Sequence, residues 1–265
     1  MAAPTVTRPF SQLDVAPTAA RILGLNLPQS DGRPINLVEG WGCRNVALII
    51  IDSLGYDLFG WLMPRLENLS TLARDGLLLQ AEAVSSHTTP AIATILSGLL
   101  PEHHGIFNKA GAKESSILSI PEIASASGLR TAVVMEQNGA EVYRGLIEII
   151  AGIPDDLCPE DFDREACRMT LEALSSSPRL LVSYFIGIDK TVHAGQGLEK
   201  IGEAALHIDQ CLGRIACAAD EETLFIICGD HPVHAGKFKR SKGPYSVALI
   251  LAKGRAQKKG CHGLR

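Results

Sequence analysis

The sequence predicts an α/β fold in which a mostly parallel sheet is flanked by helices, and two patterns support this prediction. Short apolar segments run without alternating polar residues, which is typical of strands covered on both faces. Amphipathic segments with helical spacing separate them, as in chains that form parallel sheets. The predicted strands are 46–51, 77–83, 131–135, 180–187, 223–228 and 246–251. The predicted helices are 64–75, 90–98, 119–127, 161–176 and 197–218.

Length and composition indicate one globular domain over residues 1–265. A chain of 265 residues can bury one substantial core, and a hydrophobic content of 46% argues against disorder. The Gly- and Pro-rich segments 28–42, 152–160 and 232–245 are expected to be loops within this domain, because no repeat or low-complexity linker interrupts the chain.

Charge, hydropathy and cysteine usage exclude several classes of partner. The net charge is −4 without a long basic run, so nothing indicates binding to nucleic acid. The apolar runs 45–51 and 223–228 are far shorter than the ~20 residues that span a bilayer, and the first residues lack a signal-peptide pattern. The 7 cysteines are scattered, so we expect a reduced, cytoplasmic setting. The oligomeric state stays open.

Carboxylates and imidazoles follow three of the predicted strands. Ligands of open parallel sheets gather beyond the carboxyl ends of the strands, so these residues are the first candidates for a site. After strands 46–51, 180–187 and 223–228 the candidates are, in order, Asp52; Asp189 and His193; and Asp230, His231 and His234. One aspartate after a strand is usually a helix N-cap, but this whole set is enough for two metal ions. Mixed oxygen and nitrogen donors favour Zn²⁺, Mn²⁺ or Fe²⁺ over Ca²⁺ or Mg²⁺.

Two threonines, Thr88 and Thr89, precede Pro90 and a predicted helix. A threonine hydroxyl is a poor nucleophile by itself, and a bound metal that lowers its pKa removes this barrier. The alternative role of Thr88 is a simple helix N-cap. That role does not exclude catalysis, because a helix N-terminus also favours a developing anion.

Four segments, taken in order, resemble the alkaline phosphatase superfamily, and most closely its type I phosphodiesterase/nucleotide pyrophosphatase branch. They are "VALIIIDSLGYDLF", "TTPAIATILSGLLPEHHGIF", "GIDKTVHAGQG" and "CGDHPVHAG", and their order and spacing agree with the family across 45–235. The resemblance implies an alkaline-phosphatase-like three-layer sandwich. It also implies two divalent metal ions, most simply Zn²⁺, and a small phosphorylated substrate.

The resemblance also assigns roles to residues. It implies that Asp52, Asp230, His231 and the nucleophile hold one metal ion. The nucleophile falls on Thr88, which has the T-x-P relation to the following proline. Asn108 is the candidate for binding phosphoryl oxygens, although it stands one residue earlier than the family spacing.

The second metal ion would be held by Asp189, His193 and a third histidine. That histidine is expected to be His234, which precedes the last predicted strand, with His262 beyond this strand as the alternative. The adjacent His103 and His104 are expected to close a turn rather than to bind metal.

Residues 10–35 resemble a segment that family members carry at their C-terminus. This implies a circular permutation, in which the segment has a structural role and no catalytic one. The alternative is a chance similarity of an amphipathic helix that begins near Asp14 and ends at Gly24.

The resemblance implies a metal-dependent hydrolase of phosphate esters that acts through a phosphothreonine intermediate. The alternatives are a phosphoglycerate-mutase-like phosphotransferase and a non-catalytic metal-binding member of the fold. A sulfatase is not expected, because "TTPAI" lacks the Cys or Ser of the C/S-x-P-x-R motif.

Overall fold

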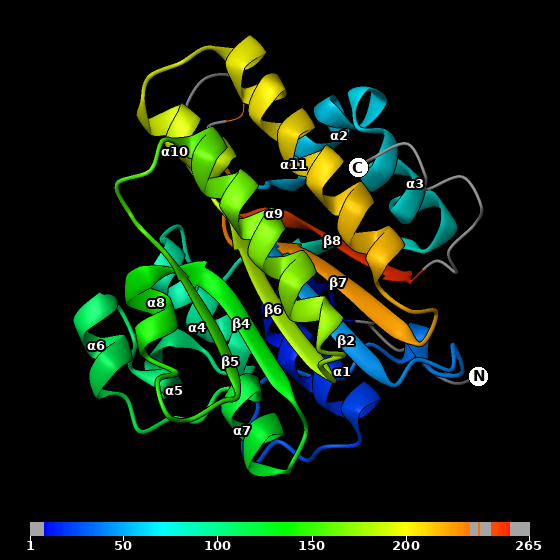
Figure 1. The fold of residues 1–265 in the computed structure, drawn as a ribbon, viewed down its shortest axis with the longest axis vertical. Coiled ribbons are helices and arrows are strands. Elements are labelled where there is room, and N and C mark those ends of the chain that lie inside the picture. Colours follow the sequence, from blue (N-terminus) through cyan, green and yellow to red (C-terminus); the bar gives the residue numbers. More distant parts are fainter. Residues whose placement is uncertain (1–7, 234–237, 239–244, 255–265) are drawn as a thin grey trace, which may run out of the picture.

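The computed structural model describes residues 8–233, 238 and 245–254, whose strands form one 8-stranded sheet (Figure 1). The strands are β1 (Phe10–Ser11), β2 (Asn45–Ile51), β3 (Leu77–Glu82), β4 (Thr131–Glu136), β5 (Ile149–Ile153), β6 (Leu180–Phe185), β7 (Thr223–Gly229) and β8 (Ser246–Lys253). Their order in the sheet is β1-β3-β8-β7-β2-β6-β4-β5. β8 pairs antiparallel with β3 and β7, and the other neighbouring strands pair in parallel. The predicted α/β class is confirmed.

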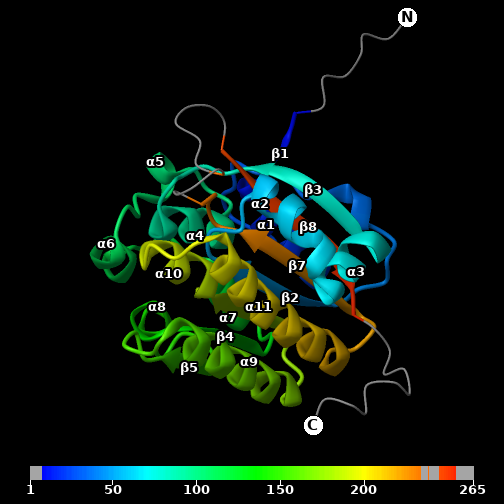
Figure 2. The same cartoon turned by 90° about the horizontal axis from the view of Figure 1, so that it is seen from above.

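Helices cover both faces of the sheet and give the structure three layers (Figure 2). The described α-helices are α1 (Val15–Leu23), α2 (Tyr56–Leu62), α3 (Glu67–Asp75), α4 (Thr88–Ser97), α5 (Pro101–His104), α6 (Lys109–Glu114), α7 (Ile120–Ala126), α8 (Gln137–Glu141), α9 (Pro159–Ser175), α10 (Gly187–His193) and α11 (Leu198–Ala218). α2, α3, α9 and α11 pack on one face, while α1 and α7 pack on the other and contact α4. Among the described residues, no helix combines the length and the apolar character needed to cross a membrane.

The central strands form the core because helices exclude water from both of their faces. Every residue of β6 and β7 is buried, as the continuous apolar runs predict. The predicted strand 180–187 is too long, since α10 already begins at Gly187. The carboxylate of Asp163 accepts hydrogen bonds from the backbone N–H groups of Ile186 (2.9 Å) and Gly187 (3.0 Å), and these contacts stabilise the start of the helix.

Short elements at the margins of the sheet have no counterpart in the apolar pattern. β5 is an edge strand of "IIAGI", and four of its five residues are only partly buried. α2 follows β2 after a tight turn in which Gly55 occupies the N-cap position. A strand with a glycine and an exposed edge buries too little surface for a strong sequence signal.

Residues 10–35 pack against the helix that carries Thr88. The backbone N–H groups of Asp31 (2.8 Å) and Gly32 (3.3 Å) donate to the carbonyl of Gly98, the residue that ends α4. Gly98 has φ +73°, and a Cβ there would lie 2.8 Å from the Ser30 hydroxyl, so the approach requires glycine. The segment thus fixes one end of α4, while the circular permutation itself stays a prediction.

Candidate active site

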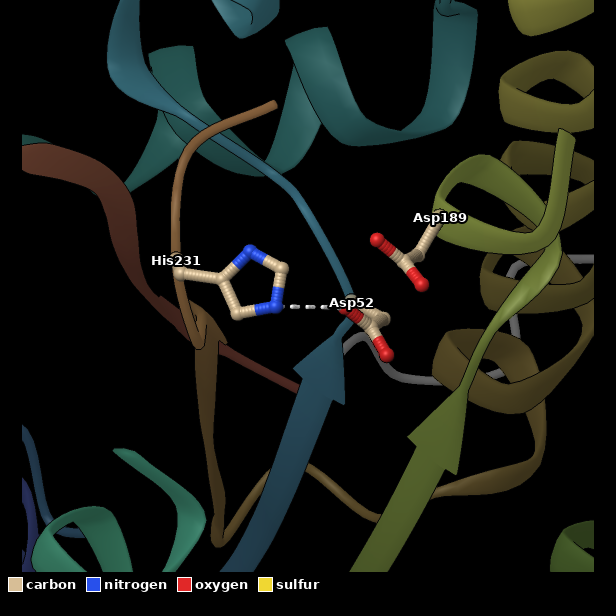
Figure 3. Close-up of side chains that lie close together, drawn as sticks. All are labelled: Asp52, Asp189 and His231. Atoms are coloured by element: carbon tan, nitrogen blue, oxygen red, sulfur yellow. Dashed lines mark ion pairs between the residues drawn. The ribbon is translucent and has the colours of Figure 1, made fainter. Parts of the chain in front are cut away.

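Three neighbouring strands bring acidic side chains and an imidazole to one edge of the sheet (Figure 3). β2 pairs in parallel with both β6 and β7, so their carboxyl ends lie side by side. Asp52 directly follows β2, and Asp189 lies in the first turn of α10, just after β6. Asp230 and His231 directly follow β7. All four side chains are buried.

The Nε2 atom of His231 lies at the centre of this cluster. It is 3.1 Å from Thr88 Oγ1, 3.3 Å from Asp52 Oδ1 and 3.4 Å from Asp230 Oδ2. An imidazole nitrogen carries at most one proton, so it cannot satisfy three oxygen atoms as a donor. The four residues that the resemblance assigns to one metal ion therefore converge, and their oxygens have too few donors.

The donor set fits a divalent cation. Asp52 Oδ1 and Asp230 Oδ2 are buried, and neither has a hydrogen-bond partner among the described residues. Ligand atoms of Asp52, Asp189 and His231 all lie within 4.8 Å of one another. Two carboxylate oxygens without hydrogen-bond partners, an imidazole and a hydroxyl are the mixed O/N set that Zn²⁺ and related ions accept.

Burial and mutual repulsion perturb the acids of this cluster. Burial raises the pKa of Asp52 well above its usual value, and the nearby charges of Asp230 and Asp189 raise it further. Burial also raises the pKa of Asp230 to about 7, against the lowering effect of two backbone N–H donors. Adjacent buried carboxylates are unfavourable without a compensating cation, which is a second sign that this site accommodates a metal ion.

The second predicted ligand set is described only in part. His193 Nε2 lies 3.3 Å from Asp189 Oδ2, and the two residues stand one helical turn apart on α10. The imidazole of His193 is 69% exposed, whereas the carboxylate of Asp189 is largely buried. His234 and the alternative His262 lie outside the described residues.

Thr88 is the first residue of α4, and its hydroxyl is directed to His231. The N-cap position belongs to His87, whose side chain makes no capping hydrogen bond. The simple N-cap role is therefore not the one that the structure gives Thr88. Thr89, the next residue, lines a neighbouring pocket.

Asn108 does not join this cluster. It is exposed and occupies the N-cap of α6, where its Oδ1 accepts a hydrogen bond from the backbone of Gly111 (2.9 Å). Its predicted contact with phosphoryl oxygens rests on the resemblance alone.

The paired histidines after α4 make contacts within the turn. His104 is buried, its Nε2 lies 3.2 Å from Thr94 Oγ1, and its Nδ1 accepts from the backbone of Ile106 (2.9 Å). His103 is exposed and lies 2.7 Å from a carboxylate oxygen of Asp31. Both sets of contacts agree with a role in closing the turn.

Two supporting residues have no signal in the sequence. Ser53 has φ 64°, a left-handed conformation that is rare for serine, and it donates from its backbone to Asp230 (2.9 Å) and from its hydroxyl to Asp189 (2.7 Å). The Tyr184 hydroxyl donates to Asp52 Oδ2. These contacts connect side chains that are far apart in the sequence, so they emerge only from the fold.

Comparisons with known proteins agree with this architecture. Residues 44–146, which include Asp52 and Thr88, match the Sulfatase family model. No curated protein matches the sequence significantly. The structure is similar to phosphonoacetate hydrolase from Sinorhizobium meliloti 1021, with a TM-score of 0.60 and 15% identity over 77% of this chain and 59% of that one.

Two further solved structures share the fold. The lipoteichoic acid synthase LtaP from Listeria monocytogenes gives a TM-score of 0.57 at 14% identity, over 92% of this chain and 72% of that chain. A protein in the alkaline phosphatase superfamily from Vibrio parahaemolyticus gives 0.55 at 16%, over 81% of this chain and 61% of that chain. The chain thus spans 59% of the hydrolase and 61% of the Vibrio protein. The chain therefore has the α/β fold of the alkaline phosphatase superfamily, and its residues 44–146 match the Sulfatase family model.

Proposed function

We propose that the protein is a metal-dependent hydrolase of phosphate esters, with Thr88 as its nucleophile. The observation that carries this proposal is the position of Thr88 Oγ1, 3.1 Å from His231 Nε2. Around the same nitrogen lie two buried carboxylate oxygens that lack a hydrogen-bond partner among the described residues, one from Asp52 and one from Asp230. A hydroxyl at the edge of an electron-rich donor cluster is the arrangement expected of a metal-activated nucleophile.

Two divalent ions would bind here, and we propose Zn²⁺ because the donors are mixed oxygen and nitrogen. Asp52, Asp230, His231 and Thr88 would hold one ion, while Asp189 and His193 would contribute to the other, completed by His234 or His262. When bound, the ions supply positive charge for the phosphoryl oxygens and lower the pKa of the hydroxyl.

The chain's own residues account for orientation. Thr88 begins α4, so the N-terminus of this helix favours negative charge on Oγ1 and on an adjacent phosphoryl group. The Thr88 hydroxyl loses its proton as Oγ1 attacks phosphorus. The P–Oγ1 bond forms while the P–O bond of the ester breaks, and the leaving oxygen takes up a proton to depart as the alcohol. Water then cleaves this bond, which releases phosphate from a monoester and regenerates Thr88. Tyr184 and Ser53 hold the carboxylates of Asp52 and Asp189 in place.

The type of ester is the finer part of the proposal. The resemblance favours the phosphodiesterase/nucleotide pyrophosphatase branch. The Sulfatase family match over 44–146 favours a sulfate ester as the second candidate. The residue at position 88 argues against a sulfate ester. Sulfatases oxidise a Cys or Ser at this position to the aldehyde formylglycine. Threonine carries a methyl group on Cβ, so its oxidation cannot yield this aldehyde. A phosphoglycerate-mutase-like phosphotransferase is less favoured, because that branch normally uses Ser where this chain has Thr88. A non-catalytic metal-binding protein is less favoured, because it does not explain a threonine hydroxyl directed into the donor cluster.

The decisive experiment measures metal content together with turnover of p-nitrophenyl phosphate, bis-p-nitrophenyl phosphate and p-nitrophenyl sulfate. We expect turnover of at least one phosphate ester by the wild type and a loss of about 10³-fold or more in Thr88→Ala. Acid-quenched enzyme should carry one phosphoryl group on the peptide that contains Thr88. Thr71→Ala, the same substitution on α3 at a residue that does not line the pocket, should keep this turnover.

Two outcomes contradict the proposal. One is a metal-loaded wild type that hydrolyses neither phosphate ester, and the other is full activity in Thr88→Ala. Turnover of the sulfate ester alone would establish the second candidate instead. Comparing the metal content of His234→Ala and His262→Ala would identify the last ligand, with loss of one ion expected in His234→Ala.

We also propose a cytoplasmic location and the circular permutation of 10–35.

A further inference from the structure

A pocket of about 360 Å³ opens beside Thr88, Asp52 and Asp189. Beyond these residues it is enclosed by α4, α6, α7, α8 and the end of β4. Apolar side chains form much of its wall: Ile92, Leu96, Ile106, Ile117, Met135 and Val142. A pocket that is mainly apolar with a few polar groups is suited to the organic part of a small ligand.

One polar group in this pocket has an unused hydrogen-bonding atom. Glu136, at the end of β4, is 18% exposed, and its buried Oε2 has no hydrogen-bond partner among the described residues. Lys109 Nζ lies 3.9 Å from the other oxygen, which is beyond hydrogen-bonding distance, and this lysine is 60% exposed. A buried acceptor without a partner is unfavourable by about 1–3 kcal/mol.

The carboxylate of Glu136 is held in this position by the neighbouring helix. A Cβ on Gly139 in α8 would lie 3.1 Å from each of its two oxygens, so the helix backbone passes directly beside the carboxylate. Burial raises the pKa of Glu136, and Lys109 opposes this rise, as expected for a carboxyl enclosed by apolar walls.

Several other polar groups of the pocket already have partners. Asp155 accepts from Asn138 Nδ2 (2.8 Å), and the Lys190 ammonium donates to the Asp155 backbone carbonyl (3.1 Å). The Ser119 hydroxyl donates to a carboxylate oxygen of Glu122 (2.7 Å). Glu136 thus lines this part of the pocket with a carboxylate that has one oxygen without a hydrogen-bond partner among the described residues, and a ligand that reaches it can supply the missing donor.

We propose that this pocket binds the organic part of the ester, and that the substrate carries an apolar body ending in a hydroxyl or ammonium that donates to Glu136. The inference rests on the proposed function, because it places the ester at Thr88. A site with a buried acceptor rejects ligands that lack the matching donor, since the acceptor would stay unpaired. Glu136 is thus a specificity-determining residue.

The test measures binding of non-hydrolysable probes by calorimetry on the zinc-loaded protein. The probes are alkylphosphonates of increasing chain length, each with a methyl, hydroxyl or amino terminus. We expect one range of chain lengths at which the hydroxyl and amino probes bind at least tenfold more tightly than the methyl probe. Glu136→Leu should abolish this preference, while the exposed Glu199→Leu, which also removes one carboxylate, should retain it.

Glu136→Gln provides a second variant that keeps the size of the side chain and one acceptor oxygen. It should lose at least tenfold in affinity for the amino probe while it retains a preference for the hydroxyl probe. No preference at any chain length in the wild type, or an unchanged preference in Glu136→Leu, would overturn the inference. A donor preference in a protein that turns over no phosphate ester would instead remove the proposed function and leave the pocket assignment intact.

Discussion

The hydroxyl of Ser53 donates a hydrogen bond to Asp189 Oδ1 across 2.7 Å, and so joins the turn after β2 to the helix after β6. The backbone N–H of the same serine donates to Asp230 Oδ1 across 2.9 Å. Its hydroxyl also lies 3.3 Å from His231 Nδ1. One buried residue thus contacts side chains from both proposed metal sites, and it does so from a left-handed backbone conformation.

Two substitutions of Ser53 separate the effect of its hydroxyl on Zn²⁺ binding from the effect of its backbone conformation on stability. Ser53→Gly and Ser53→Ala both remove the hydroxyl that orients Asp189, so each should weaken Zn²⁺ binding by about tenfold. Only glycine relieves the strain of φ 64°, which is worth roughly 1 kcal/mol. Ser53→Gly should therefore unfold with a higher free energy than Ser53→Ala, as measured by urea denaturation of the metal-free proteins. Equal stabilities would show that the left-handed backbone is unstrained here.

Tyr184→Phe removes one oxygen atom and keeps the ring in the core. The lost hydroxyl donates to Asp52 Oδ2, so the variant leaves this buried oxygen without its partner. We expect a loss of about 1–3 kcal/mol in the free energy of unfolding and a weaker affinity for Zn²⁺. Calorimetric Zn²⁺ titration and urea denaturation test both effects. Wild-type metal affinity in Tyr184→Phe would show that the hydroxyl does not orient Asp52.

Stability should depend on pH through Asp163. Burial raises the pKa of this carboxyl to about 7, although the N–H groups of Ile186 and Gly187 lower it. Because the folded pKa exceeds the unfolded value of about 3.9, the contribution to stability is complete below pH 4. It is lost as the pH rises through 7. The loss amounts to at most about 4 kcal/mol.

This dependence is measurable as the free energy of unfolding between pH 5 and pH 8, with Zn²⁺ in excess so that the metal-site carboxylates stay ionised. Asp163→Asn cannot titrate and should show a flatter pH profile than the wild type. Glu172→Gln, on the exposed side of the same helix, should keep the wild-type profile. A wild-type slope in Asp163→Asn would assign the pH dependence to other groups.

The main elements of the sheet and most of the cluster are predictable from sequence for one reason. Buried parallel strands are continuous apolar runs, and Asp52 and Asp230 directly follow two of them. Asp189 and His193 are four residues apart, a spacing that places both on one side of a helix. The order of the strands in the sheet cannot be predicted from these patterns, so only the structure shows that β2 lies between β6 and β7.

The remaining features depend on contacts that no local pattern records. Glu136 is one acidic residue among many, and its buried, unpaired oxygen arises from packing against α8. Nothing in the sequence distinguishes Ser53 from other residues that follow a strand. Its left-handed φ angle is visible only in the structure. For Asn108 the sequence makes an assignment that the contacts do not reflect. The resemblance assigns this residue to phosphate binding, and in the structure its side chain caps α6.

His104 and His103 form a matched pair for testing the turn that follows the nucleophile helix. His104 is buried, its Nδ1 accepts from Ile106, and its Nε2 therefore carries the proton that Thr94 Oγ1 accepts. His104→Ala should lower the free energy of unfolding by about 2–3 kcal/mol, because it removes the partner of the buried Thr94 hydroxyl and of the partly buried Ile106 N–H and opens a void. His103→Ala removes an exposed contact and should change it by less than about 1 kcal/mol. Both variants should bind the wild-type amount of Zn²⁺, and a loss of one ion in His104→Ala would instead make this histidine part of the metal centre.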